Sequence, residues 1–378
     1  MKIAIATVFR NTNYGAVLQA YASSTIISSI SNKECYLIDY RREKAINMFR
    51  FSIFDVDAAG NKRITKKSIK RTIKQFLNPM GTIIRFNRFE DFRERNMNIS
   101  KQVYYHSNDI NLSDTDIMFL GSDQIWNPDI TDGFDDVYFG KIGNKNIFTI
   151  SYAPSFGKTN FSESEKSKLK GLLDYVDFIS VREEEGVDIL REIVDRPITC
   201  VPDPTVLVDK KIWEDLAYAK RKEHNKYIMV YMLYPDENVI NLARTISKLF
   251  NYKIVLFDDG TLKGLNDMKS KKNYEPSEFL SYLKGAEYVV TNSFHGTIFS
   301  VIFNKKFFTV PHKTRGDRMI NFCRKVGLEN RIIYDAKQVD KEDIVVNIDY
   351  ECVNLRLDEL KEVGLTYIEN ALKGVIHG

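Results

Sequence analysis

The sequence predicts an α/β protein of two domains, whose parallel sheets face each other across a cleft. The chain has 378 residues, more than one ordinary hydrophobic core accommodates. Short apolar runs alternate with polar loops and helical patterns, which is the order of elements in βαβ units. A stretch with three prolines at residues 197–208 interrupts this order, and the same order begins again after it.

The proline-containing stretch sets the predicted domain boundaries. The N-terminal domain is expected over residues 1–205 and the C-terminal domain over residues 206–350. A last helical pattern within residues 351–378 is expected to pack back on the N-terminal domain. The sequence shows no internal repeat of fixed period, so two separate α/β domains describe it better than a repeat array.

The N-terminal domain begins with a strand, a polar turn, a helix and a second strand. Residues 2–8 (KIAIATV) are a short apolar run typical of a strand buried on both faces. The polar turn FRNTNYG (9–15) leads into a helical segment, and CYLIDY (35–40) is the second strand. After a charged interval, strands are predicted at 116–121, 146–154 and 178–183, and a helix near 184–194.

The C-terminal domain repeats this order of elements. Strands are predicted from apolar runs, and helices from apolar residues that recur with a helical period. Because the polar loops follow the strands, they should gather at the carboxyl edge of a parallel sheet. The predicted elements are strands at 227–233, 252–257, 287–292 and 305–310, and helices at 237–250, 276–286 and about 353–373.

Composition excludes several classes of protein. Hydrophobic residues make up 43% and charged residues 28% of the chain, as in globular proteins, and the net charge is only +4. Neither a zinc-finger spacing nor an RNA-binding aromatic motif is present, so no nucleic-acid partner is expected. The cysteines at 35, 200, 323 and 352 are far apart, as expected for reduced thiols. Without an apolar run long enough for a signal peptide or membrane helix, a cytoplasmic protein is predicted.

One basic segment, residues 61–77, suggests contact with a membrane. Five cations there lie opposite three apolar side chains at helical spacing: Lys66, Lys67, Lys70, Arg71 and Lys74 against Ile69, Ile73 and Phe76. A basic amphipathic helix can lie on an anionic membrane surface, here the inner face. The alternative, favoured by how common such helices are, is a solvated cationic face on a helix packed against its own domain.

His295, one of five histidines, lies where a predicted strand meets a helix. The first backbone amides of a helix and its positive dipole end form a site for phosphate or carboxylate. Asn292 or Ser293 could cap this helix, and Gly296 would allow a ligand close to the backbone. His295 could donate a hydrogen bond to phosphate or act as a general acid. The alternative is that it only caps and packs.

Two other strand ends carry candidate residues. Arg182 could bind a carboxylate or phosphate through two parallel hydrogen bonds, or could form a salt bridge with the glutamates at 183–185. The loop GSDQIWN (121–127) offers Asp123 as a general base and Trp126 as a platform for stacking a sugar. The alternative for this loop is an Asx-turn with a buried tryptophan.

Two further polar stretches could bind an anion. The stretch NTNYG (11–15) could cradle an anion or sugar hydroxyls, or Asn13 could simply cap a helix. The cluster His312, Lys313, Arg315 and Arg318 could neutralise a polyanion or form only a surface patch. No GxGxxG, P-loop, HExxH or GxSxG motif is present, which argues against dinucleotide cofactors, nucleotide hydrolysis, zinc proteolysis and serine hydrolysis. Neither a metal nor an organic cofactor is predicted.

Six motifs in order resemble the polysaccharide pyruvyl transferase family over about residues 1–330. They are FRNTNYGAVLQAYA, FLGSDQIWN, SYAPSFG, SVREEEG, VPDPTVLV and TNSFHGTIFSVIFNKKF. The resemblance implies two Rossmann-like domains of the B-type glycosyltransferase kind, with the acceptor on the N-terminal and the donor on the C-terminal domain. It implies transfer of pyruvate from phosphoenolpyruvate to two hydroxyls of a saccharide, forming a cyclic ketal in surface polysaccharide (capsule or exopolysaccharide) biosynthesis. The acceptor would be a saccharide or a lipid-linked oligosaccharide.

The resemblance also implies roles for individual residues. The family's histidine falls on His295, for phosphate binding and proton donation, and its strand-end arginine on Arg182, for the anionic groups of phosphoenolpyruvate. Asp123 is a hypothetical base for the acceptor hydroxyl. Some relatives have Arg-Leu-His where this chain has Ser-Phe-His at 293–295, so another cation must replace that arginine. The predicted substrate-binding residues are Asn13, Tyr14, Gly15, Ser122, Gln124, Trp126, Asn127, Asn292, Ser293, Phe294, Gly296, Lys313, Arg315 and Arg318.

Two other functions fit the same pattern. A B-type glycosyltransferase would hold the diphosphate of a nucleotide sugar at the helix N-terminus. A saccharide-binding protein without catalysis would use Trp126 and tyrosines as stacking platforms. Binding of phosphoenolpyruvate, binding of nucleotide sugars, and release of phosphate distinguish the three.

Overall fold

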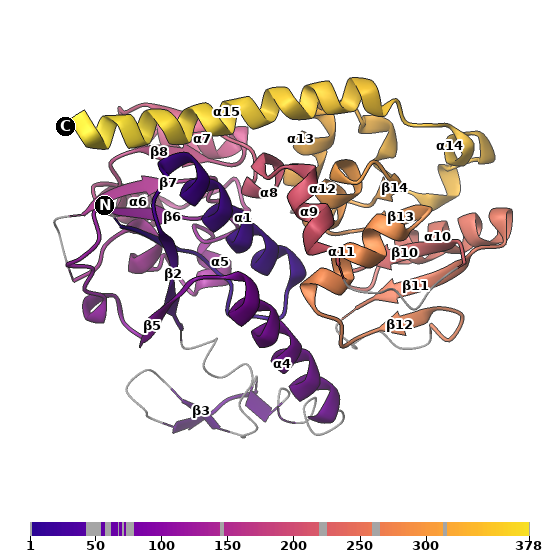
Figure 1. Cartoon of the computed structure of the whole chain (residues 1–378), viewed down its shortest axis with the longest axis horizontal. Helices are drawn as coiled ribbons and strands as arrows, with labels where there is room; N and C mark the ends of the chain where they lie inside the picture. The colour runs from indigo at the N-terminus through magenta and orange to yellow at the C-terminus, as the bar shows by residue number, and fades with distance from the viewer. Residues whose placement is uncertain are drawn as a thin grey trace. The chain divides into compact units, whose positions relative to one another are not determined.

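The chain divides into two compact units (Figure 1). Unit 1 consists of Met1–Leu207 and Val363–Gly378, and unit 2 of Val208–Glu362. Each unit has its own five-stranded parallel sheet, which confirms the predicted α/β class with two parallel sheets. The computed structural model describes residues 2–42, 54–56, 62–66, 68–69, 72, 79–143, 147–218, 225–258, 265–312 and 316–377.

The strands of unit 1 are β1 (Ile3–Ala6), β2 (Cys35–Tyr40), β3 (Phe54–Val56), β4 (Lys62–Ile64), β5 (Ile99–Tyr104), β6 (Ile117–Leu120), β7 (Phe148–Ser151), β8 (Ile179–Val181) and β9 (Ile198–Cys200). The main sheet has the order β5-β2-β1-β6-β7, all parallel. Along the chain this is 3-2-1-4-5, the order of half a Rossmann fold. A parallel bridge between Ile150 and Phe178 leads on to the small sheet β8-β9, and β3 and β4 form a separate antiparallel pair.

The helices of unit 1 are α1 (Tyr14–Ser31), α4 (Pro79–Asn96), η1 (Ser107–Asp109), α5 (Pro128–Thr131), η2 (Asp136–Phe139), α6 (Glu163–Leu173), α7 (Glu184–Arg191) and α8 (Pro204–Leu207). Helices α1 and α4 pack together through Tyr14 and Phe89, whose ring centroids are 5.1 Å apart. A different cluster joins Ala4 of β1 and Leu120 of β6 to Trp126 and to side chains of η2, α6 and α7. Both faces of the sheet are therefore covered, which explains why its central strands β1 and β6 are continuously apolar.

The strands of unit 2 are β10 (Tyr227–Tyr231), β11 (Lys253–Phe257), β12 (Lys269–Lys271), β13 (Tyr288–Thr291) and β14 (Lys306–Thr309). Their order is β12-β11-β10-β13-β14, all parallel, so unit 2 repeats the 3-2-1-4-5 order of unit 1. The helices are α9 (Lys210–Leu216), α10 (Glu237–Phe250), α11 (Pro276–Gly285), α12 (Phe294–Ile302), α13 (Asp317–Lys325), η3 (Glu329–Arg331), η4 (Ala336–Gln338) and α14 (Lys341–Val345).

Helix α10 shows how the sequence specifies its elements. Asp236 caps it by accepting hydrogen bonds from the amides of Asn238 and Val239, and Asn251 ends it in the left-handed conformation. Four apolar side chains at helical spacing, Val239, Leu242, Ala243 and Ile246, are buried against the sheet. The predicted helix at 237–250 is confirmed to the residue.

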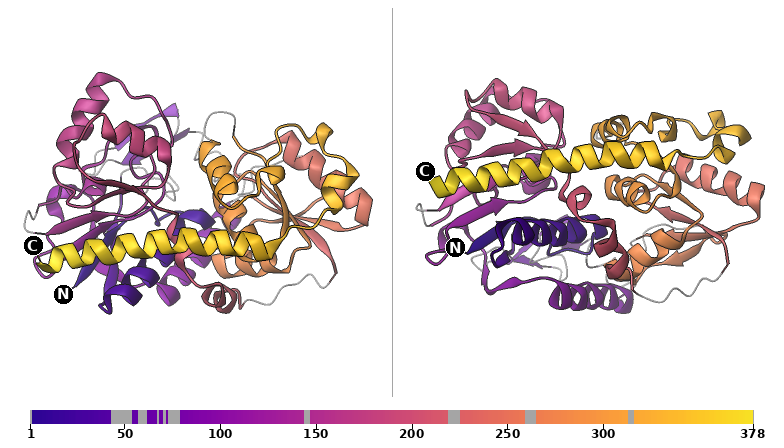
Figure 2. Two further views of the ribbon diagram at one scale, coloured as in Figure 1. Left: turned by 90° about the horizontal axis from the view of Figure 1, so that it is seen from above. Right: turned by 45° about the horizontal axis from the view of Figure 1, so that its top comes forward.

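The other face of the unit 2 sheet is covered by α11 and α12. Tyr231 at the end of β10 contacts Phe279 of α11 edge-on, with ring centroids 4.8 Å apart. Helix α12 follows β13 without a long loop and returns along the sheet to β14. Figure 2 shows the same layering from two further directions. Two loops therefore leave the carboxyl edge of the sheet from its central strands, and these loops form the candidate site described below.

The last helix, α15 (Tyr350–His377), belongs to both units. Its end forms part of unit 1, since the Tyr367 hydroxyl donates a hydrogen bond of 3.0 Å to the carbonyl of Ser151. A side chain at Gly364 or Gly374 would collide with Tyr152 or Phe178, so the helix lies against these residues closely.

The predicted basic helix at 61–77 is only partly described. Lys62–Ile64 form strand β4, not a helix, because they pair with β3. Residues 66, 68, 69 and 72 are helical, and the other residues from 67 to 77 lie outside the described part.

Candidate functional site

The central strands β10 and β13 of unit 2 lie side by side where the strand order reverses. In sheets of this order, ligands bind at that point beyond the carboxyl ends of the strands. The side chain of Asn292 joins the two loops that leave these ends. Its Oδ1 accepts a hydrogen bond from the amide of Leu233 (2.9 Å), and its Nδ2 donates one to the carbonyl of Tyr234 (3.0 Å). Asn292 is therefore occupied in holding the loop after β10.

Ser293 is the N-cap of α12. Its hydroxyl accepts a hydrogen bond from the amide of Gly296 (3.3 Å), and its own amide donates one to Oγ1 of Thr291 (3.0 Å). The capped end of a helix carries partial positive charge, which favours an anion beside it. The positive end of α12 therefore lies at the switch point of the unit 2 sheet.

His295 lies in the first turn of α12 and is 8% exposed. Its ring meets that of Phe294 edge-on, with centroids 5.3 Å apart. The guanidinium carbon of Arg318, in α13, lies 5.4 Å from the centre of the same Phe294 ring. Three of the predicted residues, Phe294, His295 and Arg318, are thus brought together in unit 2.

Tyr234 and His312 also lie at this site; His312 was predicted as part of the basic cluster after residue 311, whereas Tyr234 was not predicted. Their rings are nearly perpendicular, with centroids 5.0 Å apart. The Tyr234 hydroxyl is buried and has no hydrogen-bond partner among the described residues. Burial, and then the charge of Asp236, raise the pKa of Tyr234 to about 12, so the hydroxyl keeps its proton at neutral pH. The strand order would have indicated Tyr234, because it follows the first strand of a 3-2-1-4-5 sheet.

The predicted role of Gly296 is wrong in this structure. A Cβ on Gly296 would lie 2.5 Å from Oγ1 of Thr291 and 3.1 Å from a ring carbon of Tyr231. The space beside the glycine is filled by these two strand residues, not by a ligand. Gly296 is therefore required for the close approach of α12 to β10 and β13.

Of the three cations predicted near residue 315, the structure describes one. Lys313 and Arg315 lie outside the described residues. Arg318, half-buried on α13, is close to His295 through Phe294, as described above. It is therefore the described candidate for the positive charge that replaces the absent arginine at position 293.

In unit 1, Arg182 is paired with two carboxylates. Its Nη1 lies 2.8 Å from Oδ2 of Asp203 and its Nε 2.9 Å from Oε1 of Glu183, and its side chain is 3% exposed. Burial lowers the pKa of Arg182, but Glu183, Asp203 and Asp123 more than compensate and raise it. The structure thus shows the salt bridge that was the alternative for Arg182. Ser122 joins this network by donating to Asp203 (3.1 Å).

The loop that contains Asp123 is also largely committed to the fold. Asp123 is half-buried in the left-handed conformation, with φ at 73°, and its carbonyl accepts from the amide of Ser155. Gln124 accepts a hydrogen bond from Asn127 (2.7 Å), and Asn127 caps α5. The predicted stacking role of Trp126 is wrong in this structure: its ring is fully buried, parallel to that of Phe139 at 4.9 Å.

The turn at residues 9–13 is held by arginines of α4. Arg93 donates to the carbonyls of Phe9 (3.1 Å) and Asn11 (2.8 Å), and Arg85 donates to that of Thr12 (2.9 Å). Asn13 is exposed and caps α1 through the amide of Ala16. The two residues after it, Tyr14 and Gly15, are buried, so of this predicted group only Asn13 is open to a ligand.

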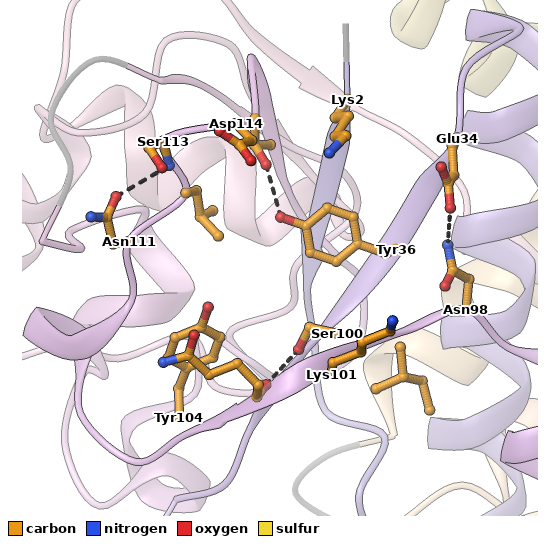
Figure 3. A pocket seen from close by; sticks show the side chains of 14 residues that line it. Lys2, Glu34, Tyr36, Asn98, Ser100, Lys101, Tyr104, Asn111, Ser113 and Asp114 are labelled. Carbon is orange, nitrogen blue, oxygen red and sulfur yellow. Dashed lines mark hydrogen bonds between the residues drawn. The ribbon is translucent and has the colours of Figure 1, made fainter.

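A pocket of about 460 Å³ lies elsewhere in unit 1 and contains none of the predicted site residues. Figure 3 shows its polar lining, including Tyr36, whose hydroxyl is 2.8 Å from that of Thr115. Lys2 and Glu34 directly precede β1 and β2, so this pocket lies toward the amino ends of these strands. Ligands of Rossmann-ordered sheets bind at the opposite, carboxyl edge.

The described residues offer neither a cluster of metal-binding side chains nor a membrane-spanning helix. No group of three or more histidine, cysteine, aspartate or glutamate side chains in this part of the chain could hold a metal ion. No described helix is long and apolar enough to cross a membrane.

The fold and the site define a two-unit α/β protein with polar and aromatic residues at the switch point of its second sheet. The chain belongs to the polysaccharide pyruvyl transferase family, whose sequence profile matches residues 13–314, and so to a family of transferases. No curated protein matches it significantly.

Solved structures with similar folds have low sequence identity to this chain. One is the UDP-GlcNAc 2-epimerase of Methanocaldococcus jannaschii (13% identity, all of both chains covered, TM-score 0.44). Another is a Thermobaculum terrenum O-GlcNAc transferase mutant (8% identity, 99% of this chain and 66% of that one, TM-score 0.48). A third is the E. coli heptosyltransferase WaaC with ADP (11% identity, 97% of this chain and 100% of that one, TM-score 0.37).

Proposed function

We propose that this protein transfers pyruvate from phosphoenolpyruvate to two hydroxyls of a saccharide and forms a cyclic ketal. The observation that carries the proposal is the position of His295, in the first turn of a capped helix at the switch point of unit 2, within the residues that match the family. Phosphoenolpyruvate is a small trianion, and a helix N-terminus with an imidazole and a guanidinium nearby offers the charges that it needs.

The donor side of the reaction is assigned to unit 2. The phosphate is placed at the start of α12, where the helix dipole favours negative charge. His295 donates a hydrogen bond to the phosphate and acts as general acid. The Tyr234 hydroxyl contributes a second hydrogen-bond donor beside the imidazole of His295. Arg318 supplies the positive charge that relatives with Arg-Leu-His obtain from the arginine.

The proposed reaction requires proton transfer to phosphoenolpyruvate and correct placement of two sugar hydroxyls. A proton adds to the methylene carbon of phosphoenolpyruvate and leaves positive character on C2, to which the first sugar hydroxyl adds. The first hydroxyl loses its proton as it adds, the carbon–oxygen bond to phosphate then breaks, and the second hydroxyl closes the ring as it loses its own proton. Of these two protons, one replaces the proton given to the methylene carbon and the other leaves on the phosphate. The products are the ketal and inorganic phosphate, so atoms and charges balance without an oxidant or reductant.

The acceptor side is assigned to the carboxyl edge of the unit 1 sheet, with Asn13 as a contact and Asp123 as the base for the sugar hydroxyl. Arg182 is assigned a positioning role, because Asp203 and Glu183 already neutralise it. It holds Asp203 and the loop after β6 in place through Ser122. A cleft that would bring the two edges together stays a prediction.

The experiment is to incubate the protein with phosphoenolpyruvate and a panel of galactosides, mannosaminides and glucosides. We expect phosphate release that depends on the acceptor, and an acid-labile carboxyethylidene product detected by mass spectrometry. Stabilisation by UDP- or GDP-sugars but not by phosphoenolpyruvate would indicate a glycosyltransferase instead. Sugar binding without any phosphate release would indicate a saccharide-binding protein.

Variants test the assigned residues. His295→Gln should slow transfer by roughly 10²–10⁴-fold, the usual contribution of a general acid. Tyr234→Phe should raise the KM for phosphoenolpyruvate by about tenfold, the worth of one hydrogen bond. His106→Ala, at an exposed histidine before η1, is the control and should keep normal activity. Normal turnover in His295→Gln would remove His295 from the mechanism.

A further inference from the structure

The basic charge of this protein is concentrated in one segment. Residues 58–89 contain nine lysines and arginines and no aspartate or glutamate. Because the formal net charge of the whole chain is +4, the remaining residues together carry −5. A local excess of positive charge of this size attracts anionic surfaces. The small net charge of the whole chain does not reveal this excess.

The same segment exposes large aliphatic side chains. Ile64 at the end of β4 and Ile69 shortly after it are exposed, as are Ile83 and Ile84 near the start of α4. Lys62 and Arg63, which precede Ile64 in strand β4, are also exposed. We define the docking surface by its described residues, Lys62, Arg63, Ile64, Lys66, Ile69, Ile83 and Ile84.

Helix α4 is polarised along its length. Its buried face includes Arg85 and Phe89, and the outward positions near its start are Ile83 and Ile84. Further along, the exposed positions are Asn87, Asp91, Glu94 and Arg95, which together carry a formal charge of only −1. An anionic surface would therefore meet no carboxylate in the first half of α4 and a small acidic excess in its second half.

We propose that the docking surface binds the face of an anionic phospholipid bilayer. Lysine and arginine side chains on such a surface meet the negative headgroups, and aliphatic side chains enter the boundary with the acyl chains. A nucleic acid would satisfy the cations but would offer the isoleucines no apolar environment. The combination of exposed isoleucines and cations favours the bilayer.

Helix α4 links the docking surface to the candidate acceptor side of unit 1. Arg85, next to Ile84 in the chain, donates to the carbonyl of Thr12, and Arg93 to that of Asn11. The helix that carries the aliphatic residues thus also holds the turn at the carboxyl edge of the unit 1 sheet. Docking would bring this edge near the bilayer, which suits an acceptor saccharide carried on a lipid. This last step rests on the proposed function, whereas the docking itself does not.

The test measures binding to vesicles without any substrate. Sucrose-loaded vesicles of phosphatidylcholine with about one-third phosphatidylglycerol should sediment the protein, and vesicles of phosphatidylcholine alone should not. Ionic strength near ~1 M should weaken the binding, because salt screens the headgroup charge. Failure to sediment with the anionic vesicles at low salt would overturn the proposal and leave the transfer reaction untouched.

Two pairs of matched variants identify the surface. Ile83→Asp with Ile84→Asp (45% and 42% exposed) should reduce vesicle binding at least about tenfold. Val345→Asp with Val346→Asp (42% and 49% exposed), in unit 2, should not. Lys62→Glu with Arg63→Glu should also reduce binding, whereas Lys168→Glu with Lys170→Glu, on exposed positions of α6, should have a much smaller effect. Vesicle binding that is unchanged by the isoleucine variants, or equal affinity for a soluble polyanion such as heparin, would overturn the proposal.

Discussion

The side chain of Asn292 fixes the backbone of Tyr234 across the two central strands of unit 2, donating to its carbonyl over 3.0 Å. The same side chain accepts from the amide of Leu233, so both ends of the amide are used. Asn292 is buried, and it lies directly before the cap of α12. The geometry of the candidate donor site thus depends on one side-chain amide that both accepts and donates a hydrogen bond.

Asn292→Asp tests this dependence. The carboxylate would still accept from Leu233, but its second oxygen would face the carbonyl of Tyr234 without a proton between them. We expect a loss of about 1–3 kcal/mol in the free energy of unfolding, the cost of a broken buried hydrogen bond. The KM for phosphoenolpyruvate should also rise, because Tyr234 is displaced. Urea unfolding and steady-state kinetics measure the two effects, and Asn241→Asp, exposed on α10, is the control.

Arg182→Met should destabilise unit 1. The substitution leaves Asp203 and Glu183 buried without their cation, and removing one partner of a buried ion pair costs roughly 3–5 kcal/mol. A lower midpoint of urea unfolding is therefore expected together with any loss of activity. Arg191→Met, at a side chain that is 69% exposed, should change the midpoint little. Unchanged stability with abolished transfer would instead support direct contact between Arg182 and the substrate.

Gly296→Ala should destabilise unit 2 by about 1–3 kcal/mol, the usual cost of an extra methyl in a packed core. The new Cβ would meet Oγ1 of Thr291 at 2.5 Å. Adding Thr291→Ala removes this collision, so the double variant should lose less stability than the sum of the single variants. Gly171→Ala is the control, because nothing lies within 4 Å of a Cβ there. Additive losses would show that the two residues do not collide.

Asp39 should make stability depend on acidity. Burial raises the pKa of Asp39, but hydrogen bonds from Arg41 and Arg10 outweigh it and leave the pKa below its usual value of 3.8. A carboxyl with a depressed pKa in the folded state stabilises the protein above its unfolded pKa. That contribution is lost as the pH falls from about 4 through the folded pKa.

Asp39→Asn removes this contribution. The variant should lose about 1.5–3 kcal/mol of stability at neutral pH, the worth of hydrogen bonds to a charged group. Its stability should then fall less than that of the unsubstituted protein between about pH 5 and pH 2. Urea unfolding at several pH values measures the difference, and Asp188→Asn, at an exposed side chain, is the control. Parallel pH profiles would contradict the assignment.

The sequence predicted most of the fold because its central elements follow simple patterns. Helix α10 has a capping aspartate and a regular apolar stripe, so its ends were found correctly. Strand β12 (Lys-Ser-Lys) was not predicted, because its short charged sequence carries no strand signal of its own and depends on pairing with β11. Helix α4 was also missed, since two of its arginines, Arg85 and Arg93, are buried and disturb the expected alternation of polar and apolar faces.

The candidate site was predictable only in part. His295 was indicated by its place between a strand and a helix, which is a local pattern. Tyr234 was not assigned to the site, because its nearness depends on β10 pairing with β13, far away in the sequence. The roles given to Trp126 and Gly296 were wrong for a related reason: what fills the space beside a ring or a glycine is decided by residues elsewhere in the chain.

Helix α15 has a consequence for how the protein is made. The sheet of unit 1 is complete by Ser151, yet the Tyr367 hydroxyl that bonds to this strand end comes after all of unit 2. During synthesis, unit 1 therefore cannot make its contacts with α15 at Ser151, Tyr152 and Phe178 until the residues that follow unit 2 have been added.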